Sequence, residues 1–384
     1  MEQRSSILRV ETLVLHNFRN YQYIELALDA YLNIFVGANA QGKTNLLEAI
    51  NYAALGRSFR TRNEEELVRW GSEACTVQVG IQLQQQRQKL RLSYDLQTKK
   101  KKYFCNGVEL SRTEYVGRII PVLFTPEDLA VVKGSPQLRR KFFDELIGKI
   151  SPLYEQDLSR YQQILRQRNQ LLKTQGAKIL HSAELASWNE QLVKQGSKVM
   201  AKRKFAIHRL GLLARLAHRS LTGRKETLTV HYLSSLGEEV TAPNTNLEAL
   251  FAQALEKQAA AECRLGQTLL GPHRDDILFA INEKNARLYA SQGQQRTLML
   301  ALKLAEIEFI KSESGEFPIL LLDDVFSELD QQRRQLLVAA IEEKVQTIIT
   351  GTAAEKLGLM QNRGKLFTVE RGRVRLNDTH SANS

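Results

Sequence analysis

One segment of the sequence has the glycine, lysine and hydroxyl residues of a phosphate-binding loop at the required spacing. Residues 37–44 read GANAQGKT and match the pattern GxxxxGK[ST]. Glycines let the backbone curl around a phosphate so that several N–H groups point inward. Lys43 can then reach the β- and γ-phosphates, and the Thr44 hydroxyl can ligate Mg²⁺. The predicted ATP-binding residues are Gly37, Ala38, Asn39, Ala40, Gln41, Gly42, Lys43 and Thr44.

Two consecutive aspartates follow an apolar run later in the chain. Residues 319–324 read ILLLDD. A buried strand that ends in carboxylates brings negative charge to the edge of a sheet, where a nucleotide-bound metal would lie. We expect Asp323 to hold Mg²⁺ together with Thr44, directly or through water. Asp324 is one residue further along, so its side chain points in a different direction from that of Asp323, and we expect it to polarise the attacking water. The predicted catalytic residues are therefore Lys43 and Asp324. A helix N-cap is the structural alternative for the paired acids.

A third motif, Ser291-Gln292-Gly293-Gln294-Gln295-Arg296, directly precedes an expected helix at 297–308. A serine, an open backbone and a helix N-terminus can form a second anion cradle. Serine and glycine before a helix usually form only a cap, so the motif is weak alone. Its position about 30 residues before the acidic strand makes an anion-binding role more credible.

The segments around these motifs predict an α/β core. Residues 7–15 and 32–36 are rich in β-branched and aliphatic residues, which favours strands. Residues 44–55 place Leu46, Leu47, Ile50 and Ala54 on one face of a helix. The strand at 319–322, the helix at 330–344 and the strand at 347–349 alternate, which is typical of a partly parallel sheet.

An antiparallel part is expected between residues 75 and 110. Two strands alternate through 75–83 and 89–95, and Asn106-Gly107 suits a tight hairpin turn. We interpret the lysine run 99–102 as a solvated loop at the start of that hairpin, with a DNA contact as the alternative.

The chain between about 137 and 220 has a helical and strongly basic character. Two apolar stripes at 3–4 spacing, over 158–172 and 185–199, are joined through 174–176 and predict a short antiparallel helical hairpin. The polar Arg168 and Gln195 interrupt the seam. Residues 133–225 contain 20 Lys and Arg but 6 Asp and Glu, a net charge of +14, while the whole chain has +12. The remainder is therefore net −2, and the basic segment is the expected site of polyanion binding.

Composition excludes several classes of protein. The chain of 384 residues is long enough for more than one domain. Its three cysteines, Cys75, Cys105 and Cys263, are isolated, which argues against a disulfide framework or a zinc site. The sequence shows no signal core and no apolar stretch near the ~20 residues that span a bilayer, so we expect a cytoplasmic protein with no membrane partner. The alternative is peripheral attachment to an acidic membrane surface, which the net positive charge would also suit.

The three motifs, in this order, resemble the ABC-type ATPases. Residues 290–294, ASQGQ, look like a divergent form of their LSGGQ signature, and Ser327-Glu328-Leu329-Asp330 falls at their D-loop. The resemblance implies an α/β ABC-type P-loop ATPase head with an antiparallel β subdomain and an inserted helical domain. It also implies a head-to-tail homodimer, in which Ser291, Gly293 and Gln294 act in trans on the ATP bound by the other subunit.

Further stretches resemble the bacterial RecF family. They match from the N-terminus to about residue 370 and read LHNFRNY (15–21), LGRSFRT (55–61), FTPEDL (124–129), VKGSP (132–136) and GPHRDD (271–276). This resemblance implies an ATP-dependent recombination mediator in DNA repair and replication. Such a protein binds gapped DNA, or junctions of duplex and single strand, as an ATP-closed dimer and helps to load RecA with RecO and RecR. The expected domains are 1–125 and 266–384 for the two parts of the head and 126–265 for the inserted basic arm.

The sequence departs from the ABC pattern at three places. Asp324 stands where transporters usually have glutamate, the Q-loop glutamine is replaced around 126–127, and residues 350–352 read TGT where many members have a switch histidine. We therefore expect a weak, slow ATPase. The alternatives are the nucleotide-binding subunit of an ABC transporter and a P-loop kinase. Whether Arg57, Arg60, His273 and Arg274 touch nucleotide or DNA stays open.

Overall fold

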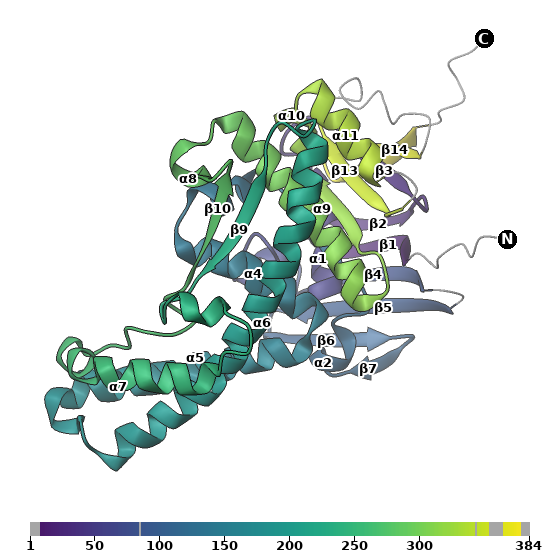
Figure 1. Cartoon of the computed structure of the whole chain (residues 1–384). Helices are drawn as coiled ribbons and strands as arrows, with labels where there is room; N and C mark the ends of the chain where they lie inside the picture. Colours follow the sequence, from purple (N-terminus) through teal and green to yellow (C-terminus); the bar gives the residue numbers. More distant parts are fainter. Residues whose placement is uncertain (1–7, 84–85, 342–343, 353–363, 378–384) are drawn as a thin grey trace, which may run out of the picture. The chain divides into compact units, whose positions relative to one another are not determined.

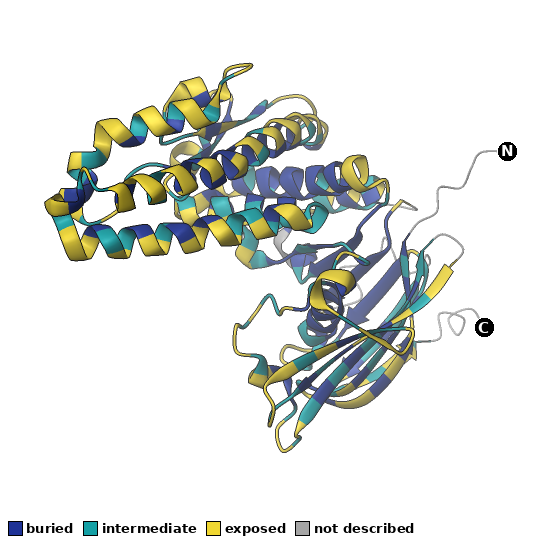
Figure 2. Cartoon of the chain, turned by 90° about the horizontal axis from the view of Figure 1, so that it is seen from below, coloured by how far each residue is buried: buried dark blue, intermediate teal, exposed yellow. Residues whose placement is uncertain are grey.

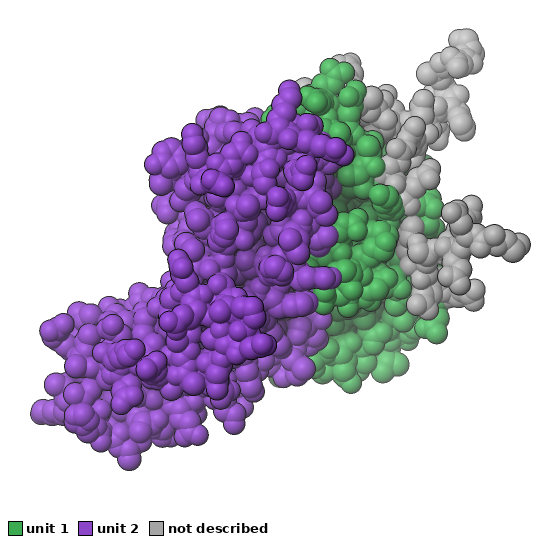
Figure 3. Space-filling view, in the orientation of Figure 1, with its two compact units in different colours: residues 1–128, 306–384 green, residues 129–305 purple. Residues whose placement is uncertain are grey.

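The computed structural model describes residues 8–83, 86–341, 344–352 and 364–377. The chain divides into two compact units (Figure 3): residues 1–128 with 306–384 form unit 1, and residues 129–305 form unit 2. The inserted unit thus ends at residue 305, whereas the sequence motifs predicted an end at 265. The long helix α9 (Gln292–Ser314) begins in unit 2 and ends in unit 1.

Unit 1 contains an antiparallel sheet of six strands in the order β2-β1-β4-β5-β6-β7 (Figure 1). Burial alternates along β4, as expected for a sheet with one face on a core. The predicted hairpin at Asn106-Gly107 is confirmed, and both residues have positive φ, at 51° and 85°. The strands are β1 Arg9–Phe18, β2 Tyr21–Ala27, β4 Ala74–Leu83, β5 Gln86–Asp95, β6 Lys100–Cys105 and β7 Val108–Leu110.

A second sheet of unit 1, in the order β15-β14-β3-β13-β12-β8, is parallel except for its edge strand β15. Every residue of β3 and β13 is buried, as expected for inner strands of a parallel sheet that is covered on both faces. Parallel pairing brings the carboxyl ends of β3, β12 and β13 to one edge, which is where the first two motifs meet. The strands are β3 Leu32–Val36, β8 Pro121–Phe124, β12 Ile319–Asp323, β13 Thr347–Gly351, β14 Lys365–Glu370 and β15 Arg373–Asn377.

Helix α1 (Lys43–Leu55) packs against strands of both sheets in unit 1. The predicted apolar face of Leu46, Leu47, Ile50 and Ala54 is buried, but so are residues on the other sides, including the fully buried Tyr52. A helix buried all round lies inside the core rather than on its surface. The helix that follows the phosphate loop therefore joins the two sheets into one core.

The interpretation of residues 99–102 as a solvated loop is wrong. Lys100 to Lys102 lie in β6, and only Lys99 belongs to the preceding turn. The Lys101 ammonium group binds the Glu64 carboxylate, and Lys99 Nζ lies 2.8 Å from Glu65. Both glutamates belong to the 3₁₀ turn Glu64–Leu67, so pairing with a distant acidic segment overrides the loop-like composition.

Unit 2 is built on helices and a small sheet of three strands, β11-β10-β9. Helices α5 and α6 pack against each other, which confirms the predicted helical hairpin. However, α6 has 39 residues, far more than the few turns expected. The long helices have one buried and one exposed side (Figure 2). The helices that lie wholly in unit 2 are α3 Leu129–Lys133, α4 Pro136–Ile150, α5 Pro152–Gln175, α6 Ala183–Leu221, α7 Leu247–Leu265 and α8 Ala286–Tyr289. The strands are β9 Leu228–Leu233, β10 Asp276–Ile281 and β11 Lys284–Asn285.

The two polar residues of the helical seam are satisfied inside unit 2. The Arg168 guanidinium is fully buried and binds Glu262 at 2.6 Å and the Thr268 hydroxyl at 2.7 Å. Gln195 Nε2 donates to the Asp157 carboxylate at 2.7 Å. These polar positions therefore fix how α5, α6 and α7 align, since a buried charge requires its partner. Across the described residues, the structure has no helix long and apolar enough to cross a membrane.

Candidate nucleotide-binding site

The phosphate loop connects the end of β3 to the start of α1. Gly37 cannot carry a side chain, because a Cβ there would lie 2.3 Å from the Val369 carbonyl oxygen. Ala40 and Gly42 have positive φ angles of 64° and 111°. The left-handed conformation turns the chain just before the first helical residue, Lys43, so the loop wraps the N-terminus of α1 as an anion site requires.

Two turns of unit 1 hold the phosphate loop from outside. The Asn20 amide donates to the Gln41 carbonyl at 3.0 Å, and the Tyr21 hydroxyl donates to the Gly42 carbonyl at 3.0 Å. On the other side, Arg371 N donates to Gln41 Oε1 at 2.7 Å. The sequence motifs predicted no role for these residues, although Asn20 and Tyr21 belong to the segment LHNFRNY.

The Lys43 ammonium group folds back onto its own loop. It donates to the carbonyls of Gly37 and Ala38, each at 2.7 Å. Burial lowers the pKa of Lys43, while the carboxylates of Asp324 and Asp323 act in the opposite direction. Phosphate oxygens would compete with the two carbonyls for the same ammonium hydrogens.

The predicted metal ligands Thr44 and Asp323 lie together. The Thr44 hydroxyl donates to Asp323 Oδ1 at 2.8 Å, and the Thr350 hydroxyl donates to the same oxygen at 2.7 Å. Among the described residues, no cluster of three or more His, Cys, Asp or Glu could hold a metal. One carboxylate and one hydroxyl fit Mg²⁺ only if phosphate and water oxygens complete its shell, as is usual at nucleotide sites.

Asp324 has a strained backbone beside this pair. Its φ is 50°, in the left-handed region that non-glycine residues rarely adopt, and its N–H donates to the Thr350 hydroxyl at 3.1 Å. Asp324 occupies the N-cap position of α10 (Val325–Glu328), but its side chain makes no capping hydrogen bond. The cap alternative therefore does not explain this residue, and strain of this kind is typical of functional sites.

The signature-like segment lies in unit 2 at the start of α9. The Ser291 hydroxyl accepts a hydrogen bond from Gln294 N at 3.2 Å, and Gln294 Oε1 accepts one from Ser291 N at 2.8 Å. These reciprocal bonds form a helix cap. Ser291 is exposed, and Gln294 Nε2 also donates to Glu226 at 2.9 Å. In the D-loop-like segment, the side chains of Ser327 and Glu328 lie outside the described residues.

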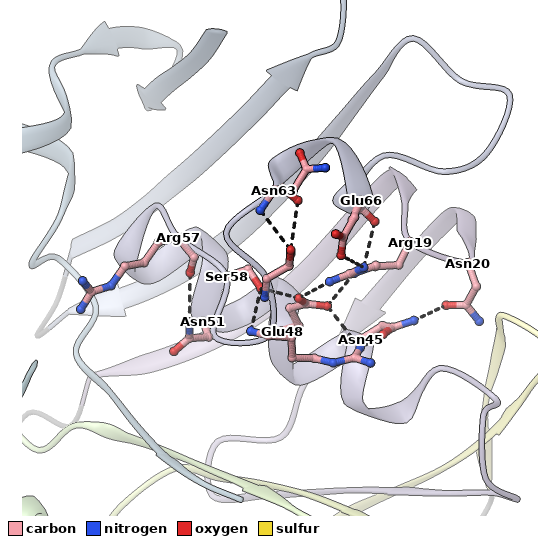
Figure 4. Close-up of polar contacts among 11 residues, drawn as sticks. Arg19, Asn20, Asn45, Glu48, Asn51, Arg57, Ser58, Asn63 and Glu66 are labelled. Carbon is pink, nitrogen blue, oxygen red and sulfur yellow. Dashed lines mark hydrogen bonds and ion pairs between the residues drawn. The ribbon is translucent and has the colours of Figure 1, made fainter. Parts of the chain in front are cut away.

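The fully buried carboxylate of Glu48, on α1, is the centre of a cluster of polar contacts that includes Arg19 and Ser58 (Figure 4). Arg19 binds Glu48 through two bonds, at 2.8 and 2.6 Å, and the Ser58 hydroxyl donates to it at 2.5 Å. Arg60 Nη1 lies 3.6 Å from Glu48 and donates to Asn45 Oδ1 at 2.7 Å. Arg57 is exposed, and its carbonyl accepts a hydrogen bond from Asn51.

His273 and Arg274, whose roles the sequence left open, make contacts inside unit 2. His273 Nδ1 lies 2.7 Å from the Tyr161 hydroxyl, and Nε2 lies 3.2 Å from the Thr268 carbonyl. Arg274 donates to the same carbonyl at 3.0 Å. Burial lowers the pKa of His273 to about 4, so the ring is neutral near pH 7.

The mixed sheets, the phosphate loop and the paired aspartates define an ATPase head of the ABC class, which confirms the predicted fold class. The model of the RecF/RecN/SMC N-terminal domain matches residues 9–375. The chain belongs to the RecF family, as its motifs predicted. It is 44% identical over 375 residues to the DNA replication and repair protein RecF of Macrococcus caseolyticus, which covers 96% of this chain and 100% of that protein. The RecF of Enterococcus faecalis is 42% identical over 376 residues, with 96% and 99% coverage.

Solved structures give the same assignment. A structure of the recombination mediator protein RecF with ATP, described as part of the RecFOR pathway, has a TM-score of 0.87 and 32% identity and covers 98% of this chain and 100% of that one. An Smc head bound to the C-terminal winged-helix domain of ScpA has a TM-score of 0.57, covers 97% of this chain and 99% of that one, and is 14% identical, so it supports the fold alone.

Proposed function

We propose that this protein binds ATP and Mg²⁺ at residues 37–44. The observation that carries the proposal is the hydrogen bond from Thr44 to Asp323, since it places a hydroxyl and a carboxylate where a metal between them could reach a bound triphosphate. Lys43 would exchange its carbonyl partners for the β- and γ-phosphates. The relative solved with ATP supports this choice of nucleotide.

The second part of the proposal is an ATP-closed homodimer. Ser291, Gly293 and Gln294 would act on the ATP of the other subunit, where the exposed Ser291 hydroxyl and the N-terminus of α9 can meet a γ-phosphate. Binding of ATP would thereby be coupled to assembly. Lys43 and Asp324 would act in hydrolysis, which should be slow because the Asp324 side chain is one methylene shorter than glutamate. A turnover of many ATP per second in the presence of DNA would disprove slow hydrolysis.

The third part is DNA binding in recombinational repair and replication. The net charge of +14 in residues 133–225 supports a polyanionic partner, and the names of the relatives support DNA. The protein would act in the cytoplasm as a mediator that binds gapped DNA or junctions and helps RecO and RecR to load RecA. RecO and RecR are supported by the assignment of the related ATP-bound protein to the RecFOR pathway, and RecA is the partner that the family resemblance implies.

One binding experiment tests the proposal. Affinity for a gapped duplex should be measured by anisotropy with and without ATP and Mg²⁺, each at two salt concentrations. We expect tighter binding with ATP and a steep loss of affinity with salt. Absence of binding to gapped and intact duplex under every condition would contradict the proposal and favour a transporter-like or kinase-like ATPase.

A further inference from the structure

Trp70 is exposed to an unusual degree. Its relative exposure of 96% is the highest of any large apolar residue in the described parts of the chain. It lies in the turn between the 3₁₀ turn Glu64–Leu67 and strand β4. Exposing a whole indole ring to water forgoes a burial free energy of about 2 kcal/mol or more, so this position requires an explanation.

The turn that carries Trp70 is held by backbone hydrogen bonds. Arg69 N donates to the Asn17 carbonyl at 2.8 Å, and Ser72 N donates to the Arg69 carbonyl at 3.0 Å. Val68 forms a bridge with Phe18, at the end of β1. Gly71, which follows Trp70, has a φ of 79°, and a Cβ added there would meet no atom within 4 Å. Trp70 is therefore an exposed ring carried on a turn whose backbone is held by hydrogen bonds.

The charges around this turn are predominantly basic. Residues 57–71 and 99–102 together contain eight Lys and Arg and three Glu. The three glutamates are engaged within unit 1: Glu64 with Lys101, Glu65 with Lys99, and Glu66 with Arg19. Five further cations are exposed. Three precede Trp70 closely in the chain, and two lie on β6, which binds the 3₁₀ turn through Lys101. They are Arg57, Arg60, Arg62, Lys100 and Lys102.

We propose that Trp70 stacks on an unpaired base of DNA while the surrounding cations bind the adjacent phosphates. This inference rests on the proposed DNA binding and names the surface of unit 1 that would read a single-stranded gap. Aromatic rings beside basic residues are the usual way in which proteins hold single strands, because every base has a π-face. Bases of an intact duplex are already stacked on one another, so Trp70 would favour DNA with unpaired bases.

The surroundings of Trp70 favour a base over a protein partner. A protein hot spot sits among further apolar residues that exclude water. The neighbours of Trp70 in the turn are Arg69, Gly71 and Ser72, none of which offers an apolar side chain.

Fluorescence provides a direct test, because the chain has only two tryptophans. In Trp188→Phe, Trp70 is the single indole reporter. We expect a gapped duplex with a stretch of unpaired thymines, added with ATP and Mg²⁺, to quench its emission, whereas an intact duplex of the same length leaves it unchanged. Unchanged emission while labelled gapped DNA is bound, as measured by anisotropy, would overturn the inference.

Substitution gives an independent test in the full-length protein. Trp70→Ala should weaken binding to gapped DNA by about 5- to 100-fold, the range expected for one base–aromatic stack, and binding to intact duplex should change little. Trp70→Phe should recover part of the affinity. Tyr23→Ala, which removes another exposed aromatic ring from the antiparallel sheet, is the matched control and should bind as wild type.

The outcomes separate this inference from the proposed function. If wild type binds gapped DNA and Trp70→Ala binds it equally well, the stacking role is wrong and the proposed function stands. If wild type binds no DNA at all, the proposed function itself fails. If Trp70→Ala binds DNA normally but no longer dimerises with ATP in sedimentation, the ring contacts a second copy of the chain and the inference is overturned.

Discussion

The Thr44 hydroxyl donates a 2.8 Å hydrogen bond to the Asp323 carboxylate, although the two residues lie 279 positions apart in the chain. One residue belongs to the first turn of α1 and the other ends β12. Parallel pairing of β3 and β12 with β13 between them brings both to the same edge of the sheet. The hydroxyl and the carboxylate are thus oriented toward each other by the sheet itself.

Substitution of Lys43 should abolish nucleotide-dependent dimerisation. Lys43→Ala removes the ammonium group that we assign to the β- and γ-phosphates, and the loss of charge-assisted bonds should weaken ATP binding by about 10- to 100-fold. Sedimentation velocity with and without ATP measures the effect. Lys100→Ala, at an exposed lysine of β6, is the control. A Lys43→Ala protein that still dimerises on addition of ATP would refute this role.

Asp323→Asn should reduce the dependence of ATP binding on magnesium. The amide keeps the shape of the side chain but loses the negative charge that attracts Mg²⁺, so affinity for Mg²⁺-ATP should fall on the order of 10-fold, whereas affinity for ATP in EDTA should not fall. Calorimetric titration with and without Mg²⁺ measures both values. Glu109→Gln, at an exposed residue of β7, provides the control. Equal losses with and without Mg²⁺ would argue against a metal ligand.

Ser291→Arg should separate ATP binding from dimer closure. Ser291 caps α9, so the substitution also costs about 1 kcal/mol of helix stability. The monomer should nevertheless bind ATP as wild type does, while the bulky cation at the proposed interface prevents closure. Ser291→Ala removes the same cap and the hydroxyl assigned to the other subunit's ATP, but adds no bulk, so it should weaken closure less than Ser291→Arg does. Normal dimer formation by Ser291→Arg in sedimentation would contradict a role of this segment in trans.

Reversal of charges on α6 should weaken DNA binding without affecting ATP binding. The exposed residues Lys194, Lys198, Arg215 and Arg219 can be replaced together by glutamate. For each phosphate that is no longer neutralised, the slope of log affinity against log salt should become shallower by roughly 0.9. Reversal of Lys257 and Lys284, also exposed but outside residues 133–225, is the matched control. Unchanged DNA affinity would place the DNA site on unit 1.

His273 should make unit 2 less stable in acid. Because the pKa is lowered to about 4 in the folded protein from the ordinary 6.5, only the unfolded chain gains a proton between these values. The stabilisation from the neutral ring is complete above pH 6.5, is lost as the pH falls toward 4, and amounts to at most about 3 kcal/mol. His273→Gln should flatten the fall of the thermal midpoint over this range. His181→Gln, at an exposed histidine, should not.

The short-range features of the site could be predicted from the sequence. The spacing of Gly37, Lys43 and Thr44 requires a strand before and a helix after, and the apolar run before Asp323 requires a buried strand. The antiparallel hairpins and the helical seam also follow from local periodicity. These features depend on residues within about ten positions of each other, which is the range over which pattern is informative.

Long-range contacts could not be predicted in this way. Asn20 and Arg371 hold Gln41 from two turns that are remote in sequence. The lysine run, whose composition is typical of a loop, lies largely in strand β6, where Lys101 binds Glu64. Arg168 is charged and yet buried between the helices, because it binds Glu262. Each of these depends on a partner whose position is fixed only by the tertiary fold.

The strand order of the parallel sheet has a consequence for synthesis on the ribosome. Strand β3 lies between β13 and β14, which are translated near the end of the chain. At ~5–20 residues per second, the 279 positions between Thr44 and Asp323 correspond to roughly 15–60 s of translation. During this interval the strand β3 lacks both of its neighbours in the parallel sheet, and the helix α1 can pack only on the antiparallel sheet, so the nascent chain is exposed to misfolding and to chaperones. A message broken before β12 would yield a product that has the phosphate loop but not its acidic partner.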